Sequence, residues 1–216
     1  MPVHTLACPD LVTSSLVASH EDLPEDRYLA GEHVYRYRAF GQTVLSPNRP
    51  RWSLGVPFFQ SKRLNSHAGG VSRTFAPLTE VAQEFARALA LRAQDHGIVP
   101  RGEFALGCHQ IRVVATDGHA APPTPEGFHR DGFAWVLIAC VARHNTDGAI
   151  TTVRRPDAVA EPLHEGPLAV GEALLLEDSL VEHHVSPLTP LRPGRAHRDV
   201  VVVTLAPVTA QEGHGA

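Results

Sequence analysis

The sequence HRDGFAWVLIACVAR, residues 129–143, decides the predicted fold. Residues 133–143 form an almost continuous apolar run, and Asn-Thr-Asp-Gly follows at 145–148, which is typical of a buried strand that ends in a turn. Several short strands with Gly, Pro, Asn and Asp between them favour a mainly β fold with flanking helices, of the jelly-roll type. Similar runs rich in Val, Ile, Leu and Thr lie at residues 110–115, 149–153, 173–176 and 200–205.

One stretch has the periodicity of a helix. In residues 78–95, Val81, Phe85 and Leu89 recur at four-residue spacing among alanines, and Gly97 stands where a helix would end. We expect this helix to pack on the sheet, because an apolar stripe on a helix needs an apolar surface to cover it.

The domain organisation is predicted to be simple. No internal repeat and no long linker rich in Pro, Gly or Ser divides the chain, and 216 residues are ample for one core. We expect a single domain over residues 1–216, in which residues 1–22 are a weakly specified lead-in, residues 23–205 the core and residues 206–216 a tail.

Composition and charge argue against several classes of protein. The formal net charge is −4, so nucleic acid is not an expected partner, because binding a polyanion needs a surplus of clustered Lys and Arg. The apolar stretch at residues 134–142 is far shorter than the roughly 20 residues of a membrane helix. We expect a cytoplasmic protein with no membrane partner, and the oligomeric state stays open. Cys8, Cys108 and Cys140 are odd in number and scattered, which favours buried free thiols.

Histidine is frequent, with 14 residues, and imidazole is a common metal ligand. Triplets of the form H-x-[DE] begin at His20, His129 and His197, and chance alone predicts about 1.5 of them in this composition. Only the triplet of His129 and Asp131 precedes a long apolar strand with further histidines after it. In an extended segment these two side chains point to the same side. A ferrous site of the two-histidine, one-carboxylate type takes three ligands and leaves its other face open.

The third ligand is predicted from a histidine pair. His183 and His184 follow the run at residues 173–176 and precede a turn at Pro187, so a neighbouring strand could bring one of them to His129. Adjacent residues of a strand point to opposite faces, so we expect only one to be a ligand. The pattern alone leaves open which one, and also whether the pair merely caps a strand.

An arginine further along the chain fits the same site. Arg198 opens the last predicted strand, and a guanidinium can hold one carboxylate of a dicarboxylic cosubstrate through two parallel hydrogen bonds. Arg192 and Arg195 compete with it, but they lie in a turn rich in Pro and Gly, where side chains are usually solvated. Arg198 is therefore preferred.

These residues and their surroundings resemble a known family, the small bacterial Fe(II)/2-oxoglutarate-dependent dioxygenases that hydroxylate free amino acids (the L-isoleucine dioxygenase group). The resemblance covers about residues 23–205, and Ala149 departs from it, because the family pattern has a second glycine there. The strongest similarity lies in PTPEGFHRDGF (123–133), RHN (143–145), Gly148, HHVSP (183–187) and RDV (198–200). Weaker similarity lies at Gln60, Asn65, Gly69-Gly70, Arg73 and HQIR (109–112).

The resemblance implies a double-stranded β-helix, a jelly-roll of cupin-like architecture, with Fe(II), 2-oxoglutarate and O2 as cofactor and cosubstrates. It implies His129, Asp131 and His183 as iron ligands, since the family's second histidine precedes x-V-[ST]-P, and His184 lies one residue late. Arg198 corresponds to the arginine that binds the distal carboxylate of 2-oxoglutarate. The implied reaction hydroxylates a free L-amino acid or similar small molecule and releases succinate and CO2.

Substrate contacts are predicted from charge and strand parity. Arg112 is our candidate for the carboxylate of an amino acid and Glu126 for its ammonium group, although either could belong to a structural ion pair. Phe133 and Trp135 share the parity of the metal triplet, so they would line the pocket or join the core. Two other functions stay open: a non-catalytic β-barrel with a structural metal, and a cupin-type metalloenzyme that does not use 2-oxoglutarate, although the paired H-x-H motif of cupins is absent.

Overall fold

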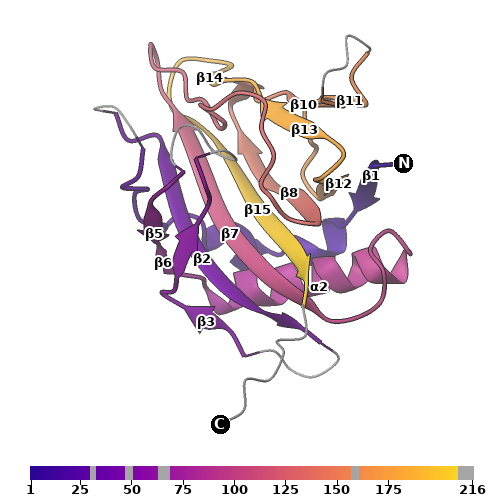
Figure 1. Ribbon diagram of the computed structural model, residues 1–216. Coiled ribbons are helices and arrows are strands. Elements are labelled where there is room, and N and C mark those ends of the chain that lie inside the picture. Colours follow the sequence, from indigo (N-terminus) through magenta and orange to yellow (C-terminus); the bar gives the residue numbers. More distant parts are fainter. Residues whose placement is uncertain (30–32, 47–50, 63–68, 157–160, 209–216) are drawn as a thin grey trace.

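The computed structural model describes the chain except for residues 30–32, 47–50, 63–68, 157–160 and 209–216, so Asn65 and most of the expected tail lie outside the described residues. Strands predominate (Figure 1). The helical elements are η1 (Pro9–Leu11), α1 (Ser14–Ala18) and α2 (Glu80–Asp95). The strands are β1 (Val3–Ala7), β2 (Arg36–Leu45), β3 (Ser53–Leu54), β4 (Pro57–Phe59), β5 (Ser72–Thr74), β6 (Ala76–Pro77), β7 (Phe104–Ala115), β8 (Trp135–His144), β9 (Thr146–Gly148), β10 (Thr151–Arg154), β11 (His164–Gly166), β12 (Glu172–Glu177), β13 (Glu182–Val185), β14 (Leu188–Pro190) and β15 (Ala196–Pro207).

A large sheet and a three-stranded small sheet form most of the architecture, and the strand pairs β14-β9 and β4-β5 join them. The large sheet has the order β1-β12-β8-β15-β7-β2-β3, with β6 added in parallel beside β2. The small sheet has the order β11-β10-β13, and Val185 of β13 belongs to the same buried cluster as Val113 of β7 and Ala196 of β15. In Figure 1 the small sheet lies over one end of β8 and β15. This is the jelly-roll, double-stranded β-helix that the sequence predicted.

The long strands extend beyond the apolar runs that predicted them. β7 and β15 pair antiparallel over their full length, from Phe104 opposite Pro207 to Ala115 opposite Ala196. Gly107 and the charged residues at the start of β15 interrupt the apolar pattern, but a backbone ladder does not depend on side-chain polarity. The predicted runs at 110–115 and 200–205 therefore mark only half of each strand.

The expected lead-in, residues 1–22, contains β1 and α1. β1 pairs antiparallel with β12 at the edge of the large sheet, and Leu6, Cys8 and Leu16 are buried in the main core. A strand of five residues and a helix of five residues are too short to give a clear periodic signal in the sequence.

The predicted helix is α2, and it covers one face of the large sheet (Figure 1). Thr79 caps its first turn through Oγ1, and Gly97, with φ of +68°, follows its last residues. Phe85 and Leu89 are buried against the sheet, while Val81 is partly buried at the rim. Because α2 covers this face with apolar side chains, the opposite face is the one left for a polar site. No helix within the described ranges is long and apolar enough to span a bilayer.

Two local predictions concern thiols and a turn. All three cysteines are free and buried, as expected, and burial raises the pKa of the Cys8 thiol to about 11. Gly148 and Ala149 both adopt left-handed backbone angles, with φ of +69° and +51°. Residues with a Cβ rarely adopt such angles, which gives a physical reason for a second glycine in the family pattern.

Candidate active site

The two histidines of the candidate site lie opposite each other in a short antiparallel bridge. His129 donates its backbone N–H to the carbonyl of His183 at 3.1 Å, and His183 donates to the carbonyl of His129 at 3.0 Å. Side chains of directly opposed residues project from the same face. The imidazole rings accordingly lie 4.3 Å apart, centroid to centroid.

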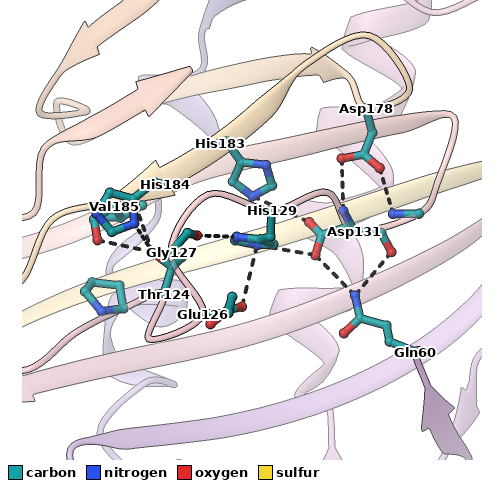
Figure 2. A network of polar contacts seen from close by, with 12 residues as sticks. Gln60, Thr124, Glu126, Gly127, His129, Asp131, Asp178, His183, His184 and Val185 are labelled. Atoms are coloured by element: carbon teal, nitrogen blue, oxygen red, sulfur yellow. Dashed lines mark hydrogen bonds and ion pairs between the residues drawn. The ribbon is translucent and has the colours of Figure 1, made fainter. Parts of the chain in front are cut away.

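Asp131 completes a group of three ligand side chains. Its Oδ1 lies 3.9 Å from Nε2 of His129, and its Oδ2 lies 3.7 Å from Nε2 of His183. One ligand atom from each of the three residues falls within 4.8 Å of the others, and no further member joins this group among the described residues. Figure 2 shows the three side chains converging from the 129–131 segment and from β13. The arrangement has the donor types of a facial ferrous site.

Asp178 fixes the backbone that carries Asp131. Its Oδ1 accepts the N–H of Asp131 at 3.0 Å (Figure 2). Its Oδ2 accepts the N–H groups of Gly132 at 2.7 Å and Phe133 at 3.2 Å. The Asp178 side chain is buried, and this burial, with the nearby charge of Asp131, raises its pKa. The Asp178 carboxylate thus fixes the backbone of residues 131–133 through hydrogen bonds.

Gln60 supports the same aspartate from the other side. Its Nε2 donates to Oδ1 of Asp131 at 3.3 Å and to the backbone carbonyl of that residue at 3.2 Å. Nη2 of Arg73 in turn donates to Oε1 of Gln60 at 2.8 Å. Such outer hydrogen bonds restrict the orientation of a metal-binding carboxylate.

Burial favours a neutral imidazole at His183. Burial above all, and the neighbouring His129, lower the pKa of His183 to about 4. Nδ1 of His129 lies 2.9 Å from the carbonyl of Gly127, which fits an Nδ1–H donor and leaves Nε2 as a lone-pair donor toward Asp131 and His183. A neutral imidazole is the form that binds a metal ion.

His184 points away from this group. Its Nδ1 lies 2.8 Å from Oγ1 of Thr124 (Figure 2). Its ring lies 5.3 Å from the ring of Phe128. The alternation of side chains in β13 therefore brings His183, and not His184, to this group.

A cavity next to the three ligand residues contains the predicted arginine. Arg198 projects from β15 into this cavity, is 3% exposed, and has no hydrogen-bond partner for Nε or Nη2 in the described parts of the chain. Burial lowers the pKa of its guanidinium. A buried cation with unused donors is costly unless an anion binds to it. Arg192 and Arg195, by contrast, are exposed.

Arg112 is not in the cavity, which corrects the sequence prediction. It lies on the opposite face of β7, where Nε and Nη2 donate to Asp199 at 2.7 and 2.8 Å, and where Glu21 binds the same guanidinium. His109, Ile111 and Val113 face the cavity, so Arg112 has the wrong parity. Its charge is used in a structural ion pair.

Trp135 is also placed elsewhere. It packs with the core beneath α2, whereas Phe133 and Glu126 line the cavity. The sequence prediction assumes an unbroken extended segment from the metal triplet onward. Residues 132–134 form a bend, with φ of +88° at Gly132, and β8 begins only at Trp135, so the alternation does not continue from the 129–131 segment to Trp135.

Several cavity residues received no role from the sequence. Arg36 and Arg38 of β2, Arg73 of β5 and His109 of β7 all line the cavity beside the ligand group. Gln60, Arg73 and His109 belong to the stretches of weaker family similarity, but nothing local in the sequence indicates that they converge. Their assembly depends on long-range pairing of β2 with β7, in which Arg38 lies opposite Ile111.

Comparison with known proteins agrees with this geometry. A family model described as 2OG-Fe dioxygenase matches residues 17–204. A solved structure of a bsmA homologue from Methylobium petroleophilum PM1 is 27% identical, with a TM-score of 0.74 over 90% of this chain and 80% of that one. The structure of IDO from Bacillus thuringiensis is 19% identical, with a TM-score of 0.71 over 96% of this chain and 91% of that one. No curated protein matched the chain.

A third solved structure, named Fe(II)/(alpha)ketoglutarate-dependent dioxygenase TqaL, shares the fold at 17% identity, with a TM-score of 0.67 over 99% of this chain and 86% of that one. The family uses Fe(II), 2-oxoglutarate and O2 and acts on small-molecule substrates. The donor set of the three ligand residues fits such an iron centre. The chain therefore belongs to the 2OG-Fe dioxygenase family and is a non-haem iron oxygenase.

Proposed function

We propose that this dioxygenase hydroxylates a free L-amino acid or a similar small molecule, with release of succinate and CO2. In this proposal His129, Asp131 and His183 hold Fe(II), and Arg198 binds the distal carboxylate of 2-oxoglutarate. The iron centre with 2-oxoglutarate and O2 supplies the oxidising chemistry for an unactivated C–H bond. The cytoplasmic location expected from the sequence stays a prediction.

One observation carries the assignment of these residues. The three ligand side chains and the unpartnered donors of Arg198 face the same cavity within the described parts of the chain. A dicarboxylate bound at the three ligand residues would have a buried guanidinium in the same cavity as a partner for its other carboxylate. Lysine in place of arginine would lack the planar pair of donors that matches a carboxylate.

The chain contributes binding, orientation and exclusion of water. Arg198 anchors one end of the cosubstrate, and Asp178 and Gln60 hold Asp131 in place through hydrogen bonds. Ile111 and Val113 of β7 provide apolar walls, so that a bound C–H group is shielded from solvent.

The charges of the cavity support an amino-acid substrate. Arg38 and Arg73 line the cavity on the β2 and β5 side, and Glu126 lines it near the metal triplet, with Oε1 3.7 Å from Nε2 of His129. Cationic and anionic groups at two places suit a zwitterion, which carries a carboxylate and an ammonium group. With Arg112 committed to Asp199, we assign the substrate carboxylate to the Arg73 side.

Succinate release against a panel of the common L-amino acids tests the substrate class. The purified chain, loaded with Fe(II) under reducing conditions, should release succinate faster with at least one amino acid than in the uncoupled reaction without substrate. If none of the panel stimulates release above that background, the amino-acid proposal is rejected.

Oxygen uptake separates the two alternative functions. A non-catalytic metal protein consumes no oxygen, and a cupin-type enzyme consumes it without 2-oxoglutarate. We expect uptake that depends on 2-oxoglutarate and that is lost in Asp131→Ala.

A further inference from the structure

His109 is a buried histidine in the wall of the cavity, outside the candidate metal site. It projects from β7, is 3% exposed, and its ring stacks on Phe40 at 4.4 Å and contacts the edge of Phe58 at 4.6 Å. Aromatic contacts on two sides leave the ring few orientations, because cores are packed densely. The position of each ring nitrogen is therefore well defined.

Arg38 determines which ring nitrogen carries the proton. Nε of Arg38 donates a hydrogen bond to Nδ1 of His109 at 3.1 Å. Burial lowers the pKa of Arg38 to about 9, which still leaves it protonated at neutral pH, and a guanidinium can only donate. Burial and the three neighbouring arginines also hold the pKa of His109 well below its ordinary range, so the ring is neutral. In a neutral ring whose Nδ1 accepts, Nε2 must carry the hydrogen.

That Nε2–H donor has no acceptor in the described parts of the chain. Nε2 of His109 is buried without a hydrogen-bond partner, and so is Nε of Arg73, which lines the same cavity. The guanidinium carbon of Arg73 lies over the ring of Phe58, 5.1 Å from the ring centroid. A buried donor without an acceptor destabilises the unliganded protein, so a ligand that supplies an acceptor is favoured at this place.

We infer that the Nε2–H of His109 and the Nε–H of Arg73 form a second carboxylate site, which binds the carboxylate of the substrate. This inference rests on the proposed function. His109 is then a specificity-determining residue: it recognises the acid group by hydrogen bonding, without adding a charge of its own.

Register places this site away from the cosubstrate anchor. Arg198 pairs with Val113 of β7, whereas His109 pairs with Val202, four residues further along the ladder. Four residues of a strand span about 13 Å. The carboxylate at Arg198 and the carboxylate at His109 are therefore different groups.

The tautomer is tested directly by NMR of the imidazole nitrogens. In the full chain, labelled with 15N and free of metal, His109 should show a protonated Nε2 and an unprotonated Nδ1 at neutral pH. Acetate, used as a minimal carboxylate, should shift Nε2 of His109, and ethylammonium, of similar size but without a carboxylate, should not. A proton on Nδ1, or an Nε2 resonance that acetate leaves unmoved, overturns the inference whatever the substrate of the enzyme is.

Two substitutions test the role in substrate binding. His109→Asn keeps an acceptor near Nδ1 for Arg38 but is too short to place an N–H at the position of Nε2, while His109→Gln extends an amide N–H to that position. Both lose the ring, so urea unfolding should show similar losses of stability. We expect His109→Asn to raise KM for the amino acid about tenfold, which is about 1.4 kcal/mol, and His109→Gln to stay close to the unmodified enzyme.

The outcomes separate this inference from the proposed function. Two results would show that the Nε2–H donor of His109 does not bind the substrate. One is an equal KM for the amino acid in the two variants, and the other is a rise in KM for 2-oxoglutarate without a rise in KM for the amino acid. If the unmodified enzyme turns over no amino acid, the proposed function fails, while the NMR titration with acetate still decides whether His109 and Arg73 bind a carboxylate.

Discussion

Asp178 is not one of the three candidate ligand residues, but it binds the backbone of the segment that carries Asp131. Its substitution therefore tests how that segment is held in place. Its two oxygens accept three backbone N–H groups, from Asp131, Gly132 and Phe133. Asp178→Asn replaces one oxygen by an NH2 group of nearly the same size. In either orientation of the amide, at least one backbone N–H then faces a donor in place of an acceptor.

The expected loss of stability follows from the backbone N–H groups that the amide can no longer accept. A hydrogen bond to a charged group contributes about 1.5–3 kcal/mol, so the free energy of unfolding should fall by at least about 1.5 kcal/mol. Loss of an outer hydrogen bond typically weakens metal binding about 10–100-fold. We therefore expect Asp178→Asn to remain folded and to bind a divalent metal with a clearly raised Kd.

The assay combines urea unfolding of the metal-free chain with calorimetric titration of Mn(II), a redox-stable substitute for Fe(II). Asp199→Asn is the matched control, since Asp199 is also a buried carboxylate with two short bonds, in this case to Arg112 on the other face of the sheet. It should lose stability and keep its affinity for Mn(II). The role given to Asp178 is refuted if Asp178→Asn binds Mn(II) as tightly as the unmodified chain, or if both variants lose affinity equally.

Three further outcomes are expected. Arg198→Met should raise the Kd for 2-oxoglutarate by at least about tenfold in calorimetry with Mn(II) present, because a charge-assisted bond is lost, and Arg192→Met should leave it unchanged. His183→Ala should abolish Mn(II) binding while His184→Ala preserves it; the reverse result would show that the other histidine is the ligand. Gly148→Ala should lower the free energy of unfolding in urea by about 2 kcal/mol or more, because φ is +69° and a Cβ would clash with the backbone carbonyl oxygen of Pro187.

The parts of the fold that could be predicted are those in which a local pattern and the tertiary environment agree. The helix α2 shows its apolar stripe in the sequence because one of its faces is buried. The apolar run in β8 predicts a strand because both faces of that strand are covered. β2 escaped prediction because its cavity face carries Arg36 and Arg38, which make it look like a polar loop.

The candidate metal site could be predicted only in part from the types of its residues. The spacing of His129 and Asp131 and the strand that follows them predict two ligands, and the family pattern adds His183. The choice of His183 over His184 and the distance to Asp131 depend on the bridge between His129 and His183, which is a long-range backbone contact. No local signal in the sequence fixes such a contact.

The sequence by itself determined the fold class, and its spacing pointed to His129, Asp131 and Arg198 as candidates for the iron and cosubstrate site, because each of these leaves a local trace in spacing or apolar pattern. Only the tertiary structure decided which charges face the cavity. Arg112 and His109 lie three residues apart on one strand, yet one binds Asp199 beneath the sheet and the other opens into the cavity. A strand alternates its faces, and which face is the inner one is set by packing across the whole sheet.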